Sequence, residues 1–118
     1  DEQAFVSNAK KFYQMMQGLF DRGDVKGLGE YCSEDMMAYI RQELNARGSQ
    51  LNVTDVVEVN ADLVGFETDF GEQLATVLYS GKVREDQGGE PVAFEEVWLL
   101  TRPAQGGGWV LSGIHNLS

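Results

Sequence analysis

The spacing of apolar residues along this chain changes near residue 50. Before that point apolar side chains recur every three or four residues, as on one face of an α-helix, and after it they alternate with polar ones, as in a β-strand. Helices followed by consecutive strands are typical of an α+β domain whose helices cover one face of a sheet. We therefore predict three N-terminal helices packed on a curved four-stranded antiparallel sheet, with a pocket between the two layers.

The helical part divides at residues that favour helix ends. The first predicted helix spans residues 2–22, and Gly23 suits a left-handed C-cap. A short second helix, N-capped by Asp24 and weakened by two glycines, is predicted over residues 24–31. Ser33 is a favourable N-cap for a third helix, which ends at Arg47 before a glycine.

The extended part divides into four predicted strands. They span residues 57–66, 74–85, 91–102 and 108–116. The alternation of the first strand changes phase at Val64, which predicts a β-bulge. A glycine-containing loop over residues 86–90 is typical of a hairpin, so sequential antiparallel pairing is the simplest topology.

The size of the chain predicts a single domain over residues 1–118. A chain of this length buries roughly two-thirds of its unfolded surface, so neither a metal nor a disulfide is required for stability. Cys32 is the only cysteine, which excludes an intrachain disulfide. Its ordinary role is core packing, and a reactive thiol is the alternative.

The negative charge is concentrated in the sheet. Of the net charge of −10, residues 1–48 contribute −2 from eight acids and six bases, and residues 49–118 contribute −8 from eleven acids and three bases. A surface this acidic repels phosphate, which argues against a nucleic-acid partner and against purely electrostatic docking on anionic lipid.

The end of the sequence carries a resemblance. The last two strands read EVWLLTR from Glu96 to Arg102 and WVLSGI from Trp109 to Ile114. This ending resembles the closing motif of the Tim44-like domain, in which E-x-W and a basic residue precede W-x-L and a Gly-Ile pair. The front half is similar too, and the resemblance extends over the whole chain. The similar residues are Phe5 and Phe12 in the first helix, Gly23 and Asp24 at the turn, and Ser33 before the third helix.

The resemblance implies a cystatin-like cone related to the nuclear transport factor 2 superfamily. It also implies a non-enzymatic binding or scaffold domain of a bacterial protein, excised from a longer chain that is anchored at an inner membrane by a preceding segment. Lipid contact is reported for the family, whereas the side of the membrane is not implied. The sequence departs from the family pattern at Leu100, where an aromatic residue is commoner, and in its acidity.

Aromatic and methionine side chains on the inward stripes form the predicted ligand pocket. Its residues are Phe12, Tyr13, Met16, Phe20, Met37, Ile40, Tyr79, Trp98 and Trp109. Methionines adapt to irregular apolar shapes, so the occupant is either an apolar ligand such as a lipid or a segment of a partner protein. Ordinary core packing is the alternative for every one of these side chains.

Two residues are weak catalytic candidates. His115 is the only histidine and, by strand alternation, shares a face with Trp109; Glu96 on the neighbouring strand would orient it. A small isomerase, dehydratase or cyclase, with Tyr13 or Tyr79 as hydrogen-bond donor, is the enzymatic alternative. The structural alternative is an exposed His115 and an ion pair between Glu96 and Arg84 or Arg102.

Other site types find no support in the sequence. No acidic spacing matches a calcium loop, no Cys/His set offers zinc ligands, and the glycine runs lack the strand–loop–helix context of a phosphate site, so we expect no metal and no cofactor. The opposite sheet face is predicted to be apolar and to support a homodimer. Its residues are Val97, Leu99, Val110 and Ile114.

Overall fold

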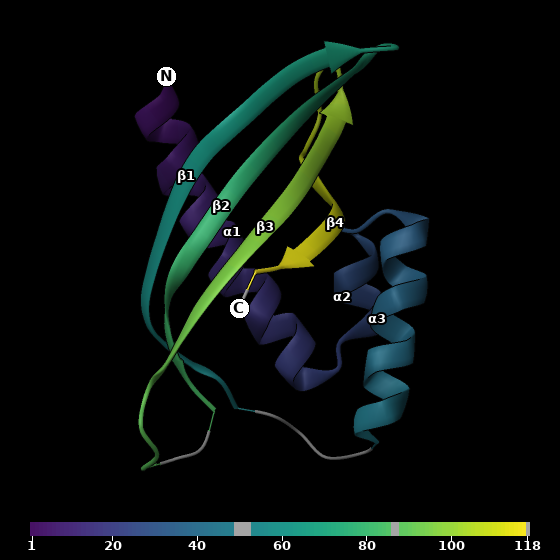
Figure 1. Cartoon of the computed structure of the whole chain (residues 1–118). Coiled ribbons are helices and arrows are strands. Elements are labelled where there is room, and N and C mark those ends of the chain that lie inside the picture. The colour runs from purple at the N-terminus through teal and green to yellow at the C-terminus, as the bar shows by residue number, and fades with distance from the viewer. Residues whose placement is uncertain (49–52, 86–87, 118) are drawn as a thin grey trace.

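The computed structural model describes residues 1–48, 53–85 and 88–117. In chain order its elements are α1 (Glu2–Arg22), α2 (Val25–Gly29), α3 (Glu34–Arg47), β1 (Asp55–Asp69), β2 (Glu72–Arg84), β3 (Val92–Pro103) and β4 (Val110–Asn116). Three long strands curve together beside α1, while α2 and α3 lie next to the short β4 (Figure 1). The α+β architecture predicted from the sequence is confirmed.

The predicted helix ends are present as capping contacts. Gly23 is left-handed, with φ 66° and ψ 31°, and its N–H donates to carbonyls of the last turn of α1. The carboxylate of Asp24 accepts from the N–H of Gly27, and the hydroxyl of Ser33 accepts from the N–H of Met36. The second helix is shorter than predicted, because α2 ends at Gly29 and residues 30–32 are turn and bridge.

The four strands pair in sequence order as an antiparallel sheet, β1-β2-β3-β4, as predicted. The register of β1 against β2 shifts between Leu63 and Gly65, which confirms the bulge at Val64. A second shift, between Val56 and Glu58, was not predicted. Part of the predicted hairpin loop, residues 86–87, lies outside the described residues.

The last strand contains a bulge that sequence alternation did not predict. Leu100 pairs with Leu111, whereas Leu99 pairs with Gly113, so Ser112 is an extra residue in β4. Everything after it changes face. Our prediction that His115 shares a face with Trp109, and that Ile114 points to the outer face, was therefore wrong.

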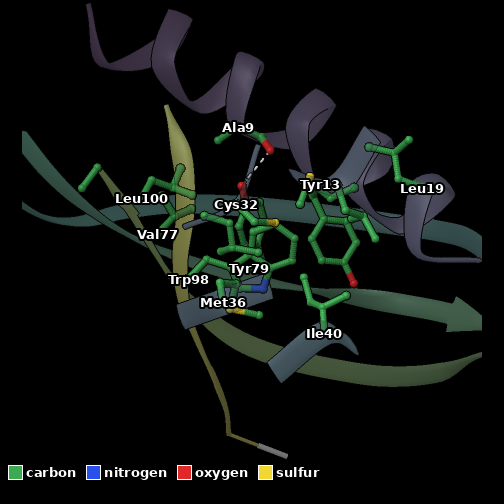
Figure 2. Close-up of a cluster of buried hydrophobic side chains, with 14 of the residues drawn as sticks. Ala9, Tyr13, Leu19, Cys32, Met36, Ile40, Val77, Tyr79, Trp98 and Leu100 are labelled. Atoms are coloured by element: carbon green, nitrogen blue, oxygen red, sulfur yellow. Dashed lines mark hydrogen bonds between the residues drawn. The ribbon is translucent and has the colours of Figure 1, made fainter. Parts of the chain in front are cut away.

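The core lies between α1 and the concave face of the sheet. Tyr13 of α1 contacts Tyr79 and Trp98, with ring centroids 5.0 and 5.1 Å apart, and stacks on Phe94 at 5.3 Å. Tyr79 is fully buried, and its hydroxyl donates to the Ala9 carbonyl at 2.7 Å (Figure 2). Both tryptophans face the helices, as predicted, because Trp109 contacts Phe5 edge-on at 5.6 Å.

Two further connections position α3, one to the sheet and one to α1. The segment before α3 pairs with β4: Leu111 donates its N–H to the Tyr31 carbonyl at 2.7 Å, and Ser33 donates to the Leu111 carbonyl at 2.9 Å. At the other end of α3, Arg47 donates to the Phe20 carbonyl at 2.9 Å and lies over the Phe20 ring.

No helix in the described part of the chain is long and apolar enough to cross a membrane.

Candidate ligand pocket

A cavity of about 250 Å³ lies where the three helices meet β4 and the middle of β3. We call it the α3–β4 pocket. Its lining residues are Met16, Gln17, Phe20, Leu28, Met36, Tyr39, Ile40, Glu43, Glu96, Trp98, Leu111, Ile114 and Asn116. Most are apolar. Four of them are exposed and form the mouth of the pocket: Tyr39, which is 51% exposed, Ile114, which is 40% exposed, Glu43 and Asn116. The pocket is therefore an apolar space with an accessible mouth.

The structure divides the nine residues of the predicted pocket among several environments. Four of them line the α3–β4 pocket: Met16, Phe20, Ile40 and Trp98. Phe12 and Trp109 line a separate cavity of about 240 Å³ near the start of α1, and Tyr13 lines a third cavity of about 290 Å³. Met37 and Tyr79 are packed in the hydrophobic core. One continuous pocket was predicted, whereas the structure divides these residues among three cavities and the core.

The third of these cavities adjoins the α3–β4 pocket, and we call it the polar cavity. The two cavities share Gln17, Glu96 and Asn116 as lining residues. Glu85 lines the polar cavity but not the α3–β4 pocket. Glu96 therefore stands between the two spaces. Its side chain is half-buried, and its Oε1 accepts from the indole Nε1 of Trp98 at 2.9 Å.

The charge of Glu96 contributes to the raised pKa values of two neighbouring tyrosines, Tyr39 and Tyr13. The pKa of Tyr39 is raised by burial, and further by the charge and hydrogen bond of Glu43 and the charge of Glu96. Burial raises the pKa of Tyr13 well above its usual 10.0, and the charges of Glu96 and Asp21 add to this. Both phenols stay neutral and remain hydrogen-bond donors in a negative environment.

The two catalytic candidates do not meet. His115 pairs with Val97, the neighbour of the inward-facing Trp98, so it lies on the outer face and is exposed. Glu96 pairs with Asn116 on the inner face. A histidine on the opposite side of the sheet cannot reach a substrate beside Glu96, so the arrangement lacks the base–orienter pair that the enzymatic alternative needs.

The predicted ion pair between Glu96 and Arg84 or Arg102 was also wrong. Arg84 instead pairs with Asp55 at 3.0 Å. Arg102 donates to the side chain of Gln73 at 2.6 Å, and its guanidinium lies 4.5 Å from the Trp109 ring centroid. In the part of the chain that the structure describes, no group of three or more His, Cys, Asp or Glu side chains is placed to hold a metal ion.

Several lining residues were not predicted as pocket residues. Ile114 was assigned to the outer face because the bulge at Ser112 is invisible to alternation. Tyr39 and Glu43 are polar residues four apart on α3, and that spacing placed them on one side of the helix. This spacing is present in the sequence, but the apolar periodicity of α3 does not include these two polar residues.

Fold and pocket together define a small α+β domain with an open antiparallel sheet and an apolar-lined cavity beneath its helices. Comparison with family models matches residues 1–116 to the Tim44-like domain, so the chain belongs to the Tim44-like domain family. The fold is consistent with the nuclear transport factor 2-like superfamily. Neither the curated proteins nor the solved structures include a match to the chain.

Family membership gives a coarse functional statement. Tim44-like domains interact with proteins or membranes, in non-enzymatic scaffold roles, and the family is membrane-associated. A binding role agrees with an accessible pocket whose lining residues are mostly apolar.

Proposed function

We propose that this chain is a non-enzymatic binding domain of a membrane-anchored protein, and that its α3–β4 pocket receives apolar side chains from a segment of a partner protein. The observation that carries the proposal is the accessible cavity lined by Met16, Phe20, Ile40 and Trp98. Family membership supports a binding role.

The size of the pocket favours a protein segment over a whole lipid. Sites that enclose drug-sized ligands usually measure about 300–1,000 Å³, and this pocket, at about 250 Å³, is smaller. Its exposed mouth residues, Tyr39 and Ile114, allow a partner's backbone to remain outside while its side chains enter. An apolar lipid chain is the other occupant that the test must distinguish.

The test is an NMR titration of the isotope-labelled domain with a short uncharged peptide of leucine and glutamine. We expect amide shifts to concentrate at the lining residues of α1 and α3. Ile114→Trp fills the mouth without changing the net charge, and it should weaken binding by about tenfold or more, the loss of one well-buried apolar contact. Val64→Trp, which adds the same ring at an exposed position of β1, is the matched control.

Three results would count against the proposal. Shifts confined to the outer sheet face would move the site elsewhere, and equal binding by the Ile114→Trp variant would exclude the pocket. Shifts produced by neutral phosphatidylcholine vesicles but not by the peptide would identify a lipid as the occupant.

Homodimerisation through the outer sheet face stays a prediction. Val97, Leu99 and Val110 do lie on that face, and Leu78 of β2 extends it, because Leu78 pairs with Val97. Sedimentation velocity at micromolar concentration distinguishes monomer from dimer.

A further inference from the structure

The walls of the α3–β4 pocket are apolar, but its charged residues are all acidic. Glu43 of α3 and Glu96 of β3 line the pocket, and Glu85 lines the adjoining polar cavity. Among the described residues that line the two spaces there is no lysine, arginine or histidine. An apolar guest that enters here therefore passes carboxylates of one sign.

Three arginines of the sheet and of α3 contact groups outside the pocket surface. Arg84 pairs with Asp55, and Arg102 lies over Trp109. Arg47 of α3 donates to the Phe20 carbonyl. None of the three lines the pocket, so the charged side chains on its surface are the carboxylates.

The carboxylates are also held in position. The indole of Trp98 donates to Oε1 of Glu96 at 2.9 Å, which fixes this carboxylate at the edge of the apolar wall. Glu43 is bonded to Tyr39 at the mouth, and both Glu43 and Glu96 raise the pKa of that tyrosine. Both carboxylates line the same pocket, so a side chain that enters it meets both.

We propose that the α3–β4 pocket selects a basic amphipathic segment of a partner protein. An apolar side chain enters beside Trp98, and a neighbouring lysine or arginine pairs with Glu96 and Glu43. This inference rests on the proposed function, to which it adds the chemistry of the partner. Charge complementarity is its main support, since the net charge of −10 attracts a basic segment and repels an anionic lipid surface.

Selectivity should be modest and dependent on salt. A partly exposed ion pair changes an equilibrium by about twofold to fivefold, and two carboxylates therefore give a preference of roughly tenfold at low ionic strength. Screening shortens the range of such pairs to about 10 Å at 0.1 M salt. The apolar contribution should persist at high salt while the charge preference declines.

The experiment compares three labelled peptides of equal length by fluorescence anisotropy: leucine with lysine, leucine with glutamine, and leucine with glutamate. We expect the lysine peptide to bind tightest and the glutamate peptide weakest. Glu43→Lys, at an exposed position of α3, should reduce or reverse this order. Glu67→Lys makes the same charge change at an exposed position of β1 far along the sheet, and it should leave the order intact.

The outcomes separate this inference from the proposed function. If all three peptides bind equally and Ile114→Trp removes that binding, the pocket is a binding site without charge selectivity, and the inference is overturned alone. If no peptide binds, both proposals fail. If the lysine preference responds equally to Glu43→Lys and Glu67→Lys, it arises from net charge rather than from the pocket, which also overturns the inference.

Discussion

Tyr79 is the residue that joins the two layers through a single buried polar contact. Its ring is fully buried against Tyr13 and Trp98, and its hydroxyl donates to the Ala9 carbonyl of α1 at 2.7 Å. Burial, and secondly the neighbouring Tyr13, raise its pKa above 10.0, so the phenol keeps its proton and remains a donor.

Removing this hydroxyl should therefore weaken the attachment of α1 to the sheet. Tyr79→Phe keeps the ring packing but leaves the Ala9 carbonyl without this donor, and we expect the free energy of unfolding to fall by about 1–3 kcal/mol. Urea unfolding followed by circular dichroism measures the change. Tyr31→Phe, which removes the hydroxyl of a half-buried ring packed on Phe12, is the control and should cost less. Equal losses in both variants would contradict the role of this bond.

The orientation of the two tryptophans was predictable from the sequence, whereas that of Ile114 and His115 was not. Trp98 and Trp109 were predicted to face the helices, and both contact α1 residues. Aromatic rings this large are rarely left in solvent when a helix covers the same face, so composition and strand alternation agree. Ile114 and His115 were placed on the wrong faces, because a one-residue bulge inverts all later positions of a strand.

At the scale of elements, Gly81 allows β1 and β2 to pair beside the unpredicted bulge in β1. It lies opposite Val59, and a Cβ added there would collide with the carbonyl oxygen of Glu58. A backbone oxygen cannot rotate away as a side chain can, so the strands themselves would have to separate. Glycine at this position is thus required by close backbone approach.

Gly81→Ala should consequently be strongly destabilising. We expect a loss of about 3 kcal/mol or more, in the range of severe steric substitutions, visible as a lower urea midpoint or as failure to fold. Gly65→Ala is the matched control on β1, since its Cβ would meet only the Thr76 side chain at an ordinary 3.5 Å. A Gly81→Ala variant as stable as Gly65→Ala would show that the pairing at Glu58 is looser than described.

Element boundaries were predictable to the extent that they depend on local chemistry. Gly23, Asp24 and Ser33 cap helices through bonds to residues a few positions away, and these caps were predicted correctly. The bulge at Ser112 depends on distant contacts: the Ser112 hydroxyl is 2.7 Å from that of Thr101 on β3, and Leu111 bonds to the segment before α3. No local pattern carries this information, so it could not be read from the sequence.

At the scale of the whole molecule, layer order and charge distribution followed from the sequence, whereas the extent of the pocket did not. The nine predicted lining residues all belong to inward stripes, but which of them faces empty space depends on how neighbouring side chains fill the interior. Met37 and Tyr79 are packed against other side chains of the core, whereas Ile40 also borders the empty space of the α3–β4 pocket. Volume is a property of the packed whole, and residue type alone does not determine it.

The buried interior also makes the whole molecule sensitive to alkali. Burial raises the pKa of Cys32 from 9.0 to about 11, and it raises those of Tyr13 and Tyr79 above 10.0. At a pH between the ordinary pKa of each group and its raised pKa in the folded protein, the unfolded chain has released a proton that the folded chain still holds. The stabilising contribution is therefore complete below pH 9.0 and is lost as the pH rises towards and beyond 11.

We expect the free energy of unfolding to stay constant from neutral pH to about 9 and then to fall, by up to about 1.4 kcal/mol per pH unit for each proton involved. Cys32→Ala removes the group with the lowest starting pKa, so its stability should hold until about pH 10, where the tyrosines of the unfolded chain begin to ionise. Urea titrations followed by far-ultraviolet circular dichroism give both profiles. If the two proteins lose stability in parallel from pH 9, the thiol ionises equally in the folded and unfolded states, and Cys32 is less enclosed than its 8% exposure indicates.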